Sequence, residues 1–212
     1  MQRLHRVIGP LATNLHVLAD ERSREAIAID TAIPSLPWLT DELAARDWTL
    51  ELIVSTHGHW DHVGDNARVA DRTGAAIAVH PLDADRLLRP DPIMAPFEIP
   101  PSVPAVDLAD GAEISFGSVR LTVLHTPGHT EGSVCLLAGE LGLLFSGDTL
   151  FAGSFGRVDL PGGDEAAMAD SLARLAGLDP GLTVLPGHGP ETSIGRELSW
   201  LEWVARERRL PI

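Results

Sequence analysis

The chain has 212 residues and a formal net charge of −14, from 30 acidic and 16 basic residues. This length predicts one domain over residues 1–212, and the acidic balance argues against a nucleic-acid partner, whose phosphates require a basic surface. The single cysteine, Cys135, excludes an internal disulfide and fits a reducing compartment. No apolar run reaches membrane-spanning length, and the first residues lack the apolar core of a signal peptide. We therefore predict a cytoplasmic protein without a membrane partner.

Short apolar runs between polar turns predict four strands in the first part of the chain. These strands cover residues 15–18, 26–29, 52–56 and 75–79. Apolar residues at helical spacing predict three helices among them. These helices cover residues 34–46, 62–73 and 83–89. The six prolines of residues 90–104 then predict an irregular loop, in which Met94, Phe97 and Ile99 pack on the surface or line a pocket.

A second series of strands and helices follows this loop. The predicted strands cover residues 113–116, 119–124, 133–137, 141–145 and 183–185. The predicted helices cover residues 165–176 and 198–209. The order of strands followed by strand–helix alternation thus occurs twice along the chain. It predicts an α/β fold of two similar halves, each a sheet covered on one side by helices, stacked as a four-layer αββα sandwich.

The strand predicted over residues 52–56 runs into the sequence His57-x-His59-x-Asp61-His62. Packing alone explains such a crowd of polar side chains poorly. Imidazole and carboxylate groups are the ligands that suit zinc and neighbouring metals. In an extended segment His57 and His59 point the same way and can share one metal. Asp61 and His62 lie where the chain turns into a helix, so they diverge from that pair and can serve a second metal.

Three further turns, each directly after an apolar strand, present a side chain of the same chemical type. These residues are His129, Asp148 and His188. Turns at strand ends hold reacting groups on a rigid base. We predict that His129 completes the first metal site, that His188 completes the second and that Asp148 bridges both. Such a two-metal centre with open positions activates water for hydrolysis.

The complete set of ligand candidates resembles the metallo-β-lactamase fold superfamily. The set consists of His57, His59, Asp61, His62, His129, Asp148 and His188. Three motifs are more narrowly similar to the glyoxalase II-like hydrolases, which are thioesterases of the hydroxyacylglutathione hydrolase type. They are Gly-Asp-Thr-Leu-Phe at 147–151, Ser-x-Gly-Arg-x-Asp-x-Pro-Gly-Gly at 154–163 and Pro-Gly-His-Gly-Pro at 186–190.

This resemblance implies two Zn²⁺ ions per chain and a bridging hydroxide that attacks a small thiol ester, with Asp61 as the catalytic residue that orients the hydroxide. Persulfide dioxygenases share much of the pattern, and they imply instead one Fe²⁺ ion held by His57, His129 and Asp148. The chain has no tyrosine, which argues against the lactonases of the superfamily. Its β-lactamases lack the bridging aspartate, so Asp148 argues against that activity. A third alternative is an interaction module that has kept the fold and lost catalysis.

Residues outside the ligand set are also predicted to support it. Asp30 ends a strand, as the superfamily's supporting aspartate does, and is expected to orient a ligand histidine. Arg157 and Asp159 are expected to pair and to hold the loop that follows Asp148.

Overall fold

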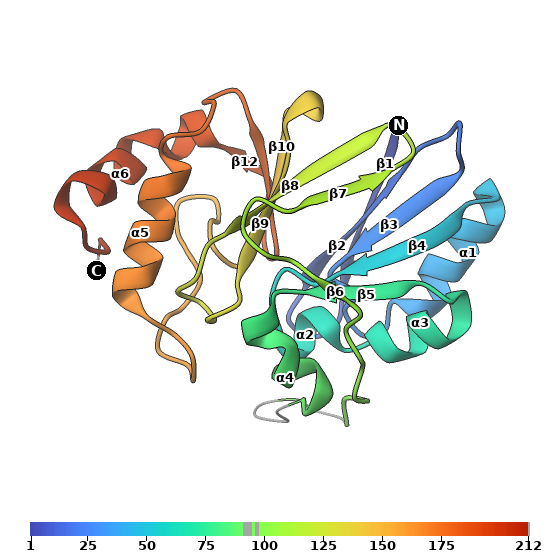
Figure 1. Cartoon of the computed structure of the whole chain (residues 1–212). Helices are drawn as coiled ribbons and strands as arrows, with labels where there is room; N and C mark the ends of the chain where they lie inside the picture. The colour runs from blue at the N-terminus through green and yellow to red at the C-terminus, as the bar shows by residue number, and fades with distance from the viewer. Residues whose placement is uncertain (91–94, 96–97, 212) are drawn as a thin grey trace.

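The computed structural model describes residues 1–90, 95 and 98–211, which form two six-stranded sheets (Figure 1). The first sheet has its strands in chain order: β1 (Gln2–Ile8), β2 (Thr13–Ala19), β3 (Glu25–Ile29), β4 (Thr49–Val54), β5 (Ala76–Val79) and β6 (Val106–Asp107). The second has the reverse order: β12 (Thr192–Ser193), β11 (Thr183–Pro186), β10 (Leu143–Gly147), β9 (Val134–Ala138), β8 (Val119–His125) and β7 (Glu113–Phe116).

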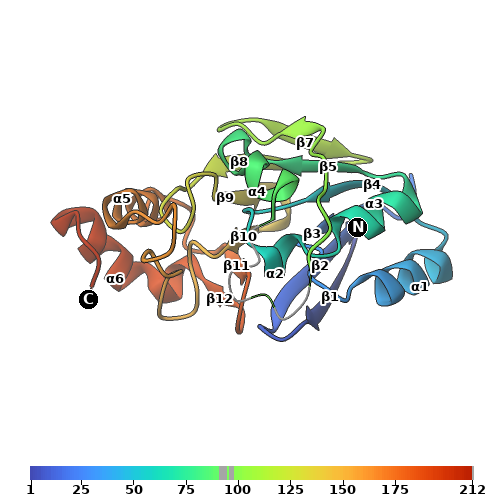
Figure 2. The same cartoon turned by 90° about the horizontal axis from the view of Figure 1, so that it is seen from below.

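Helices accompany each sheet. Those near the first sheet are α1 (Leu36–Arg46), α2 (Trp60–Val63), α3 (Asn66–Thr73) and α4 (Ala84–Leu88), the last preceded by the 3₁₀ turn η1 (Pro81–Asp83). Those near the second are α5 (Glu165–Leu175) and α6 (Ile194–Glu207), with the 3₁₀ turn η2 (Gly139–Leu141) between β9 and β10. Figures 1 and 2 show α5 and α6 at one end of the molecule and α1 and α3 at the opposite end. No helix of the described residues is both long and apolar enough to cross a bilayer.

The two sheets face each other across a buried apolar layer. Ile29 and Val54 of the first sheet pack there with Leu121 and Phe145 of the second. Separate apolar clusters join α1 and α3 to the outer face of the first sheet, and α5 and α6 to the outer face of the second. The αββα sandwich predicted from the element order is therefore confirmed.

Strands β10 and β11 are buried over nearly their whole length, and β4 is buried at its carboxyl end. Pairing is parallel for β3 with β4, β4 with β5 and β10 with β11. Parallel strands with both faces covered are continuous apolar runs rather than alternating ones, which is why β4 and β10 are readily predicted. The carboxyl ends of β4, β10 and β11 lead into the turns that carry the predicted ligands other than His129, which follows the antiparallel strand β8.

The structure differs from the predicted elements at several places, among them the short edge strands β6 and β12, which were not predicted. Strand β1 was not predicted, because Arg3, His5 and Arg6 give this edge strand the polar sequence that edges favour. The helix predicted over 62–73 is two helices, separated where the Asp65 carboxylate accepts hydrogen bonds from the first backbone N–H groups of α1. The last helix begins at Ile194 rather than at residue 198, capped by the Ser193 hydroxyl.

The predicted proline-rich loop is described only in part. Residues 91–94 and 96–97, with Met94 and Phe97, lie outside the described residues. Ile99 is buried and packs against Ile33 and Trp60. It therefore supports the base of the neighbouring loop rather than lining the cavity described below.

Candidate metal centre

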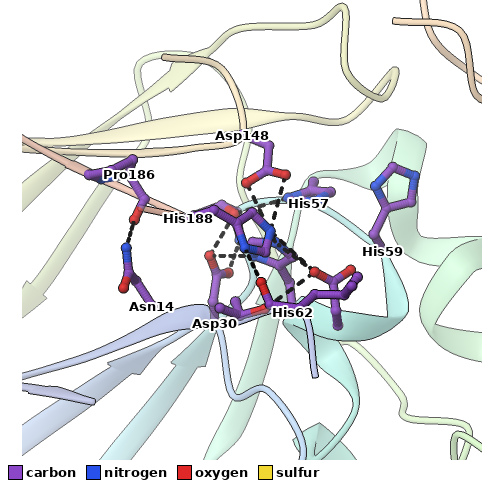
Figure 3. Close-up of polar contacts among 12 residues, drawn as sticks. Asn14, Asp30, His57, His59, His62, Asp148, Pro186 and His188 are labelled. Carbon is purple, nitrogen blue, oxygen red and sulfur yellow. Dashed lines mark hydrogen bonds and ion pairs between the residues drawn. The ribbon is translucent and has the colours of Figure 1, made fainter. Parts of the chain in front are cut away.

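Four strand ends place the predicted ligands at a common edge of the two sheets. His57 follows β4 by two turn residues, and His59 to His62 continue into α2. His129 lies in the turn after β8, Asp148 directly follows β10, and His188 lies just after β11. His62 and His188, which are 126 positions apart in the chain, are thus neighbours in space. Asp148 faces the imidazoles of both (Figure 3).

The seven side chains form three overlapping groups in which the potential ligand atoms lie within 4.8 Å of one another. The first ligand group is His57, His59 and His129. The second ligand group is Asp61, His62 and His188. The bridging group is His57, His62 and Asp148. The sequence predicted the first two groups and the intermediate place of Asp148, but not that His57 would also lie within reach of the second group.

Distances between the potential ligand atoms fit a metal. His59 Nδ1 lies 2.9 Å from His129 Nε2, and His188 Nε2 lies 3.1 Å from His62 Nε2 and 3.2 Å from Asp61 Oδ2. Around a tetrahedral zinc ion, with bonds of about 2.0–2.1 Å, neighbouring ligand atoms are about 3.3 Å apart. The side chains are therefore spaced as ligands of a common ion would be.

The imidazole rings are also oriented as metal ligands are. His129 Nδ1 donates to the Arg157 carbonyl at 2.7 Å, and His188 Nδ1 donates to the Leu11 carbonyl at 3.0 Å. In each ring the outer nitrogen is thereby fixed as the donor, so the lone pair is on Nε2, which faces the site. His57 Nε2 and Asp148 Oδ1 are buried without a hydrogen-bond partner. Buried polar atoms are rarely left so, and a metal ion would satisfy both.

The neutral imidazoles and the carboxylates of the site favour the binding of a cation. Burial lowers the pKa of His57 well below its usual value and that of His59 to about 3, with neighbouring imidazoles acting in the same direction. Both rings are therefore neutral, which is the form that binds metals. Burial also disfavours charge on His62, but the carboxylates of Asp61, Asp148 and Asp30 outweigh it and raise the pKa to about 10. The three carboxylates around His62 thus favour positive charge at this position, which a metal ion would also provide.

Asp30 has the contacts expected of a supporting residue. Its Oδ2 atom lies 3.0 Å from His62 Nδ1 and accepts from the Thr56 hydroxyl at 2.8 Å, while Oδ1 accepts from the Thr56 N–H at 2.8 Å. The residue adopts a left-handed backbone conformation with φ of 60°. This conformation is uncommon outside glycine, although aspartate tolerates it better than most residues.

Arg157 and Asp159 form the predicted pair, with Nε and Nη2 of the arginine donating to the two carboxylate oxygens at 2.7 and 2.8 Å. The link from this loop to the ligands is the Arg157 carbonyl, which accepts from His129, rather than its guanidinium group. Arg157 also lines the adjoining cavity.

Asp83 is a supporting residue that the sequence did not reveal. Its fully buried carboxylate accepts from the Gly58 N–H at 2.7 Å, the Thr130 hydroxyl at 2.7 Å and the Gly132 N–H at 3.0 Å. It thereby ties the turn that carries His57 to the turn that carries His129. An acid just ahead of a short helix is typical of an N-cap, so the sequence offered no signal for this role.

A cavity of about 520 Å³ opens onto the ligands. Its apolar wall includes Leu11, Trp60, Phe151 and Leu160, and Arg86 contributes positive charge. Cavities of this size hold small-molecule ligands. The metal centre is therefore accessible to a substrate.

Replacing Gly187 by alanine is expected to weaken metal binding by about 10–100-fold, as changes around metal ligands commonly do. A Cβ atom there would lie 2.3 Å from Asp148 Oδ1 and 2.7 Å from His62 Cε1, so both ligands must move. Zinc titration of the metal-free protein measures the effect. The matched control is Gly139→Ala, where an added Cβ meets nothing within 4 Å. Equal affinities in the two variants would contradict the expectation.

The family model of the Metallo-beta-lactamase superfamily matches residues 8–188, which include all seven ligand candidates. The chain therefore belongs to the metallo-beta-lactamase superfamily. An uncharacterized protein of Aquifex aeolicus is 40% identical over 196 residues, covering 90% of each chain. A hydroxyacylglutathione hydrolase of Anaeromyxobacter dehalogenans is 46% identical over 137 residues, which are 64% of this chain and 47% of that protein. The chain thus matches about half the length of that hydrolase.

Three solved structures with similar folds cover most of this chain. The B3 metallo-beta-lactamase BLEG-1 has a TM-score of 0.83 at 30% identity, over 96% of this chain and 99% of that one. TTHA1623, in a di-iron-bound form, has a TM-score of 0.82 at 35% identity, over 92% and 96%. ETHE1 from Myxococcus xanthus has a TM-score of 0.83 at 29% identity, over 98% and 88%. These similarities support the fold of the chain and do not assign its reaction.

Proposed function

We propose that this protein is a binuclear metallohydrolase that cleaves thioesters of the hydroxyacylglutathione type, with zinc as its metal. The observation that carries the proposal is the pair of complete ligand groups linked by Asp148. The similarity to a hydroxyacylglutathione hydrolase supports the substrate class.

Each residue of the site has a separate role in the proposed reaction. His57, His59 and His129 would hold one ion, Asp61, His62 and His188 the other, and Asp148 would be shared. Bound zinc supplies a hydroxide near neutral pH and polarises the carbonyl of the substrate. The Asp61 carboxylate, on the cavity wall, orients the nucleophile by accepting its hydrogen bond. No general acid is required, because a thiolate is a good leaving group.

A persulfide dioxygenase is the second candidate, supported by the similarity to ETHE1 over most of both chains. It would use His57, His129 and Asp148, two imidazoles and a carboxylate that suit iron(II) and oxygen. The convergence of Asp61, His62 and His188 at 3.1–3.4 Å supports the binuclear hydrolase, because their ligand atoms are spaced as those of one tetrahedral ion would be.

Metal analysis of the purified protein, combined with three assays, tests the proposal. We expect two metal equivalents per chain and cleavage of a hydroxyacylglutathione thioester that is lost on chelation and restored by zinc. One equivalent of iron with oxygen consumption on glutathione persulfide would establish the dioxygenase instead. Turnover of a β-lactam without thioester cleavage would establish the activity named for BLEG-1. Neither metal nor turnover in any assay would favour an interaction module.

The proposal includes a reducing compartment, the cytoplasm. Cys135 supports it as a fully buried thiol without a disulfide. Burial raises the pKa of this thiol to about 11, so it is neither a nucleophile nor a ligand at neutral pH.

A further inference from the structure

The turn between β1 and β2 contacts the second ligand group directly. The Leu11 carbonyl accepts from His188 Nδ1 at 3.0 Å, and the Thr13 hydroxyl donates to Asp61 Oδ2 at 3.3 Å. Thr13 also forms an isolated antiparallel bridge with His188. Two of the three residues of the second ligand group are thus held from the N-terminal hairpin.

Asn14 holds the loop that carries His188. Its buried side chain donates through Nδ2 to the carbonyls of Pro186 and Gly189, both at 2.9 Å, and its backbone N–H donates to the Gly187 carbonyl at 2.7 Å. Figure 3 shows the bond from Asn14 to Pro186 beside the ligand cluster. The carbonyls on both sides of His188 are therefore fixed by one amide group, which sets the position of the imidazole.

The first ligand group has different supports. Asp83 joins the turns of His57 and His129, and the Arg157 carbonyl orients the His129 ring. Within the described residues, no hydrogen bond or ion pair links residues 11–14 to His57, His59 or His129. The two metal positions thus rest on separate sets of contacts.

We infer that Asn14 is a positioning residue that sets the affinity of the second metal position independently of the first. This inference rests on the proposed two-metal function. Residues that orient metal ligands typically account for 10–100-fold in metal affinity. Loss of the Asn14 amide frees the Pro186–Gly189 turn, so His188 loses its fixed position while His57, His59 and His129 keep theirs. Occupancy of the second position is then controlled by the hairpin.

Stepwise zinc binding to the metal-free protein, in competition with a chromophoric chelator, tests the inference. We expect two equivalents in the wild type. In Asn14→Ala we expect the zinc affinity of one binding step, the one that fills the second position, to fall by about 10–100-fold. The affinity of the other step should be unchanged. The matched control is Asn66→Ala, which removes an equally buried amide that bonds to Thr31 and Ser55 but to none of the ligands. We expect both of its zinc affinities to match the wild type.

Each outcome has a distinct meaning. The inference would be overturned if both zinc affinities of Asn14→Ala matched the wild type, or if both fell equally in the folded variant. Neither result would contradict the two-metal function. A single equivalent in the wild type would overturn the two-metal function and the inference with it. Circular dichroism establishes folding. If Asn14→Ala does not fold, Asn14→Asp keeps the size of the side chain and removes the Nδ2 donor to the Pro186 and Gly189 carbonyls, and two wild-type affinities there would overturn the inference.

Discussion

Replacing Asp148 by alanine is expected to lower kcat/KM for the thioester by at least about a thousandfold, which is ~4 kcal/mol of transition-state stabilisation. Asp148 Oδ1 lies 3.5 Å from His62 Nε2, and Oδ2 lies 3.4 Å from His129 Nε2 and 3.5 Å from His188 Nε2. Its carboxylate thus contacts His129 of the first ligand group and both His62 and His188 of the second, so its removal is expected to disturb both proposed metal positions together. Steady-state kinetics with parallel zinc analysis of the variant measures the loss.

The control for this substitution is Asp170→Ala. Asp170 is an exposed acid on α5 that pairs with Arg208, away from the ligands. Its removal changes the net charge by the same amount and is expected to leave turnover and zinc content at wild-type levels. An Asp148→Ala protein that retains two zinc ions and turns over within tenfold of wild type would contradict the assigned role of Asp148.

Replacing Asp83 by alanine is expected to lower the free energy of unfolding by about 3 kcal/mol or more, since each buried polar group left unsatisfied costs roughly 1–3 kcal/mol. The substitution deprives the Gly58 and Gly132 N–H groups and the Thr130 hydroxyl of their acceptor. It also leaves Arg86 without the carboxylate 3.4 Å from its Nε atom. Urea denaturation of the metal-free protein measures the change without a contribution from metal binding.

Asp85→Ala is the matched control for Asp83→Ala. Asp85 lies two positions further on, in α4, where its exposed carboxylate pairs with Arg89. Exposed ion pairs contribute little, so the expected change is within about 0.5 kcal/mol. Equal stability of the two variants would show that the buried carboxylate does not hold the turns together.

The sequence predicted those parts of the fold that depend on local patterns. The carboxyl end of β4 and most of β10 are short continuous apolar runs, and their shortness distinguishes them from helices. The ligand candidates were recognised because imidazoles and carboxylates directly after such strands have no ordinary packing role. For His57 and Asp148, the chemical type of the side chain and its place in a turn were sufficient to predict a metal ligand, although the two residues are far apart in the chain.

Other features depend on contacts that no local pattern records. The partners of the Asp83 carboxylate are 25, 47 and 49 positions away in the chain. The break between α2 and α3 likewise depends on Asp65 capping a helix about 30 residues earlier. Strand β1 carries charged residues and is identified only by its pairing with β2. Such features follow from tertiary structure, which overrides local propensity.

The three ligand groups have a consequence for folding. Each group takes residues from both halves of the chain, since His129, Asp148 and His188 belong to the half with the second sheet and the other ligands to the half with the first. Neither half alone can complete any group. Under the proposed function, bound ions would therefore cross-link the two sheets, with a stabilisation of about 4 kcal/mol when free metal exceeds its dissociation constant a thousandfold. Chelation would then lower the unfolding temperature as well as remove the chemistry.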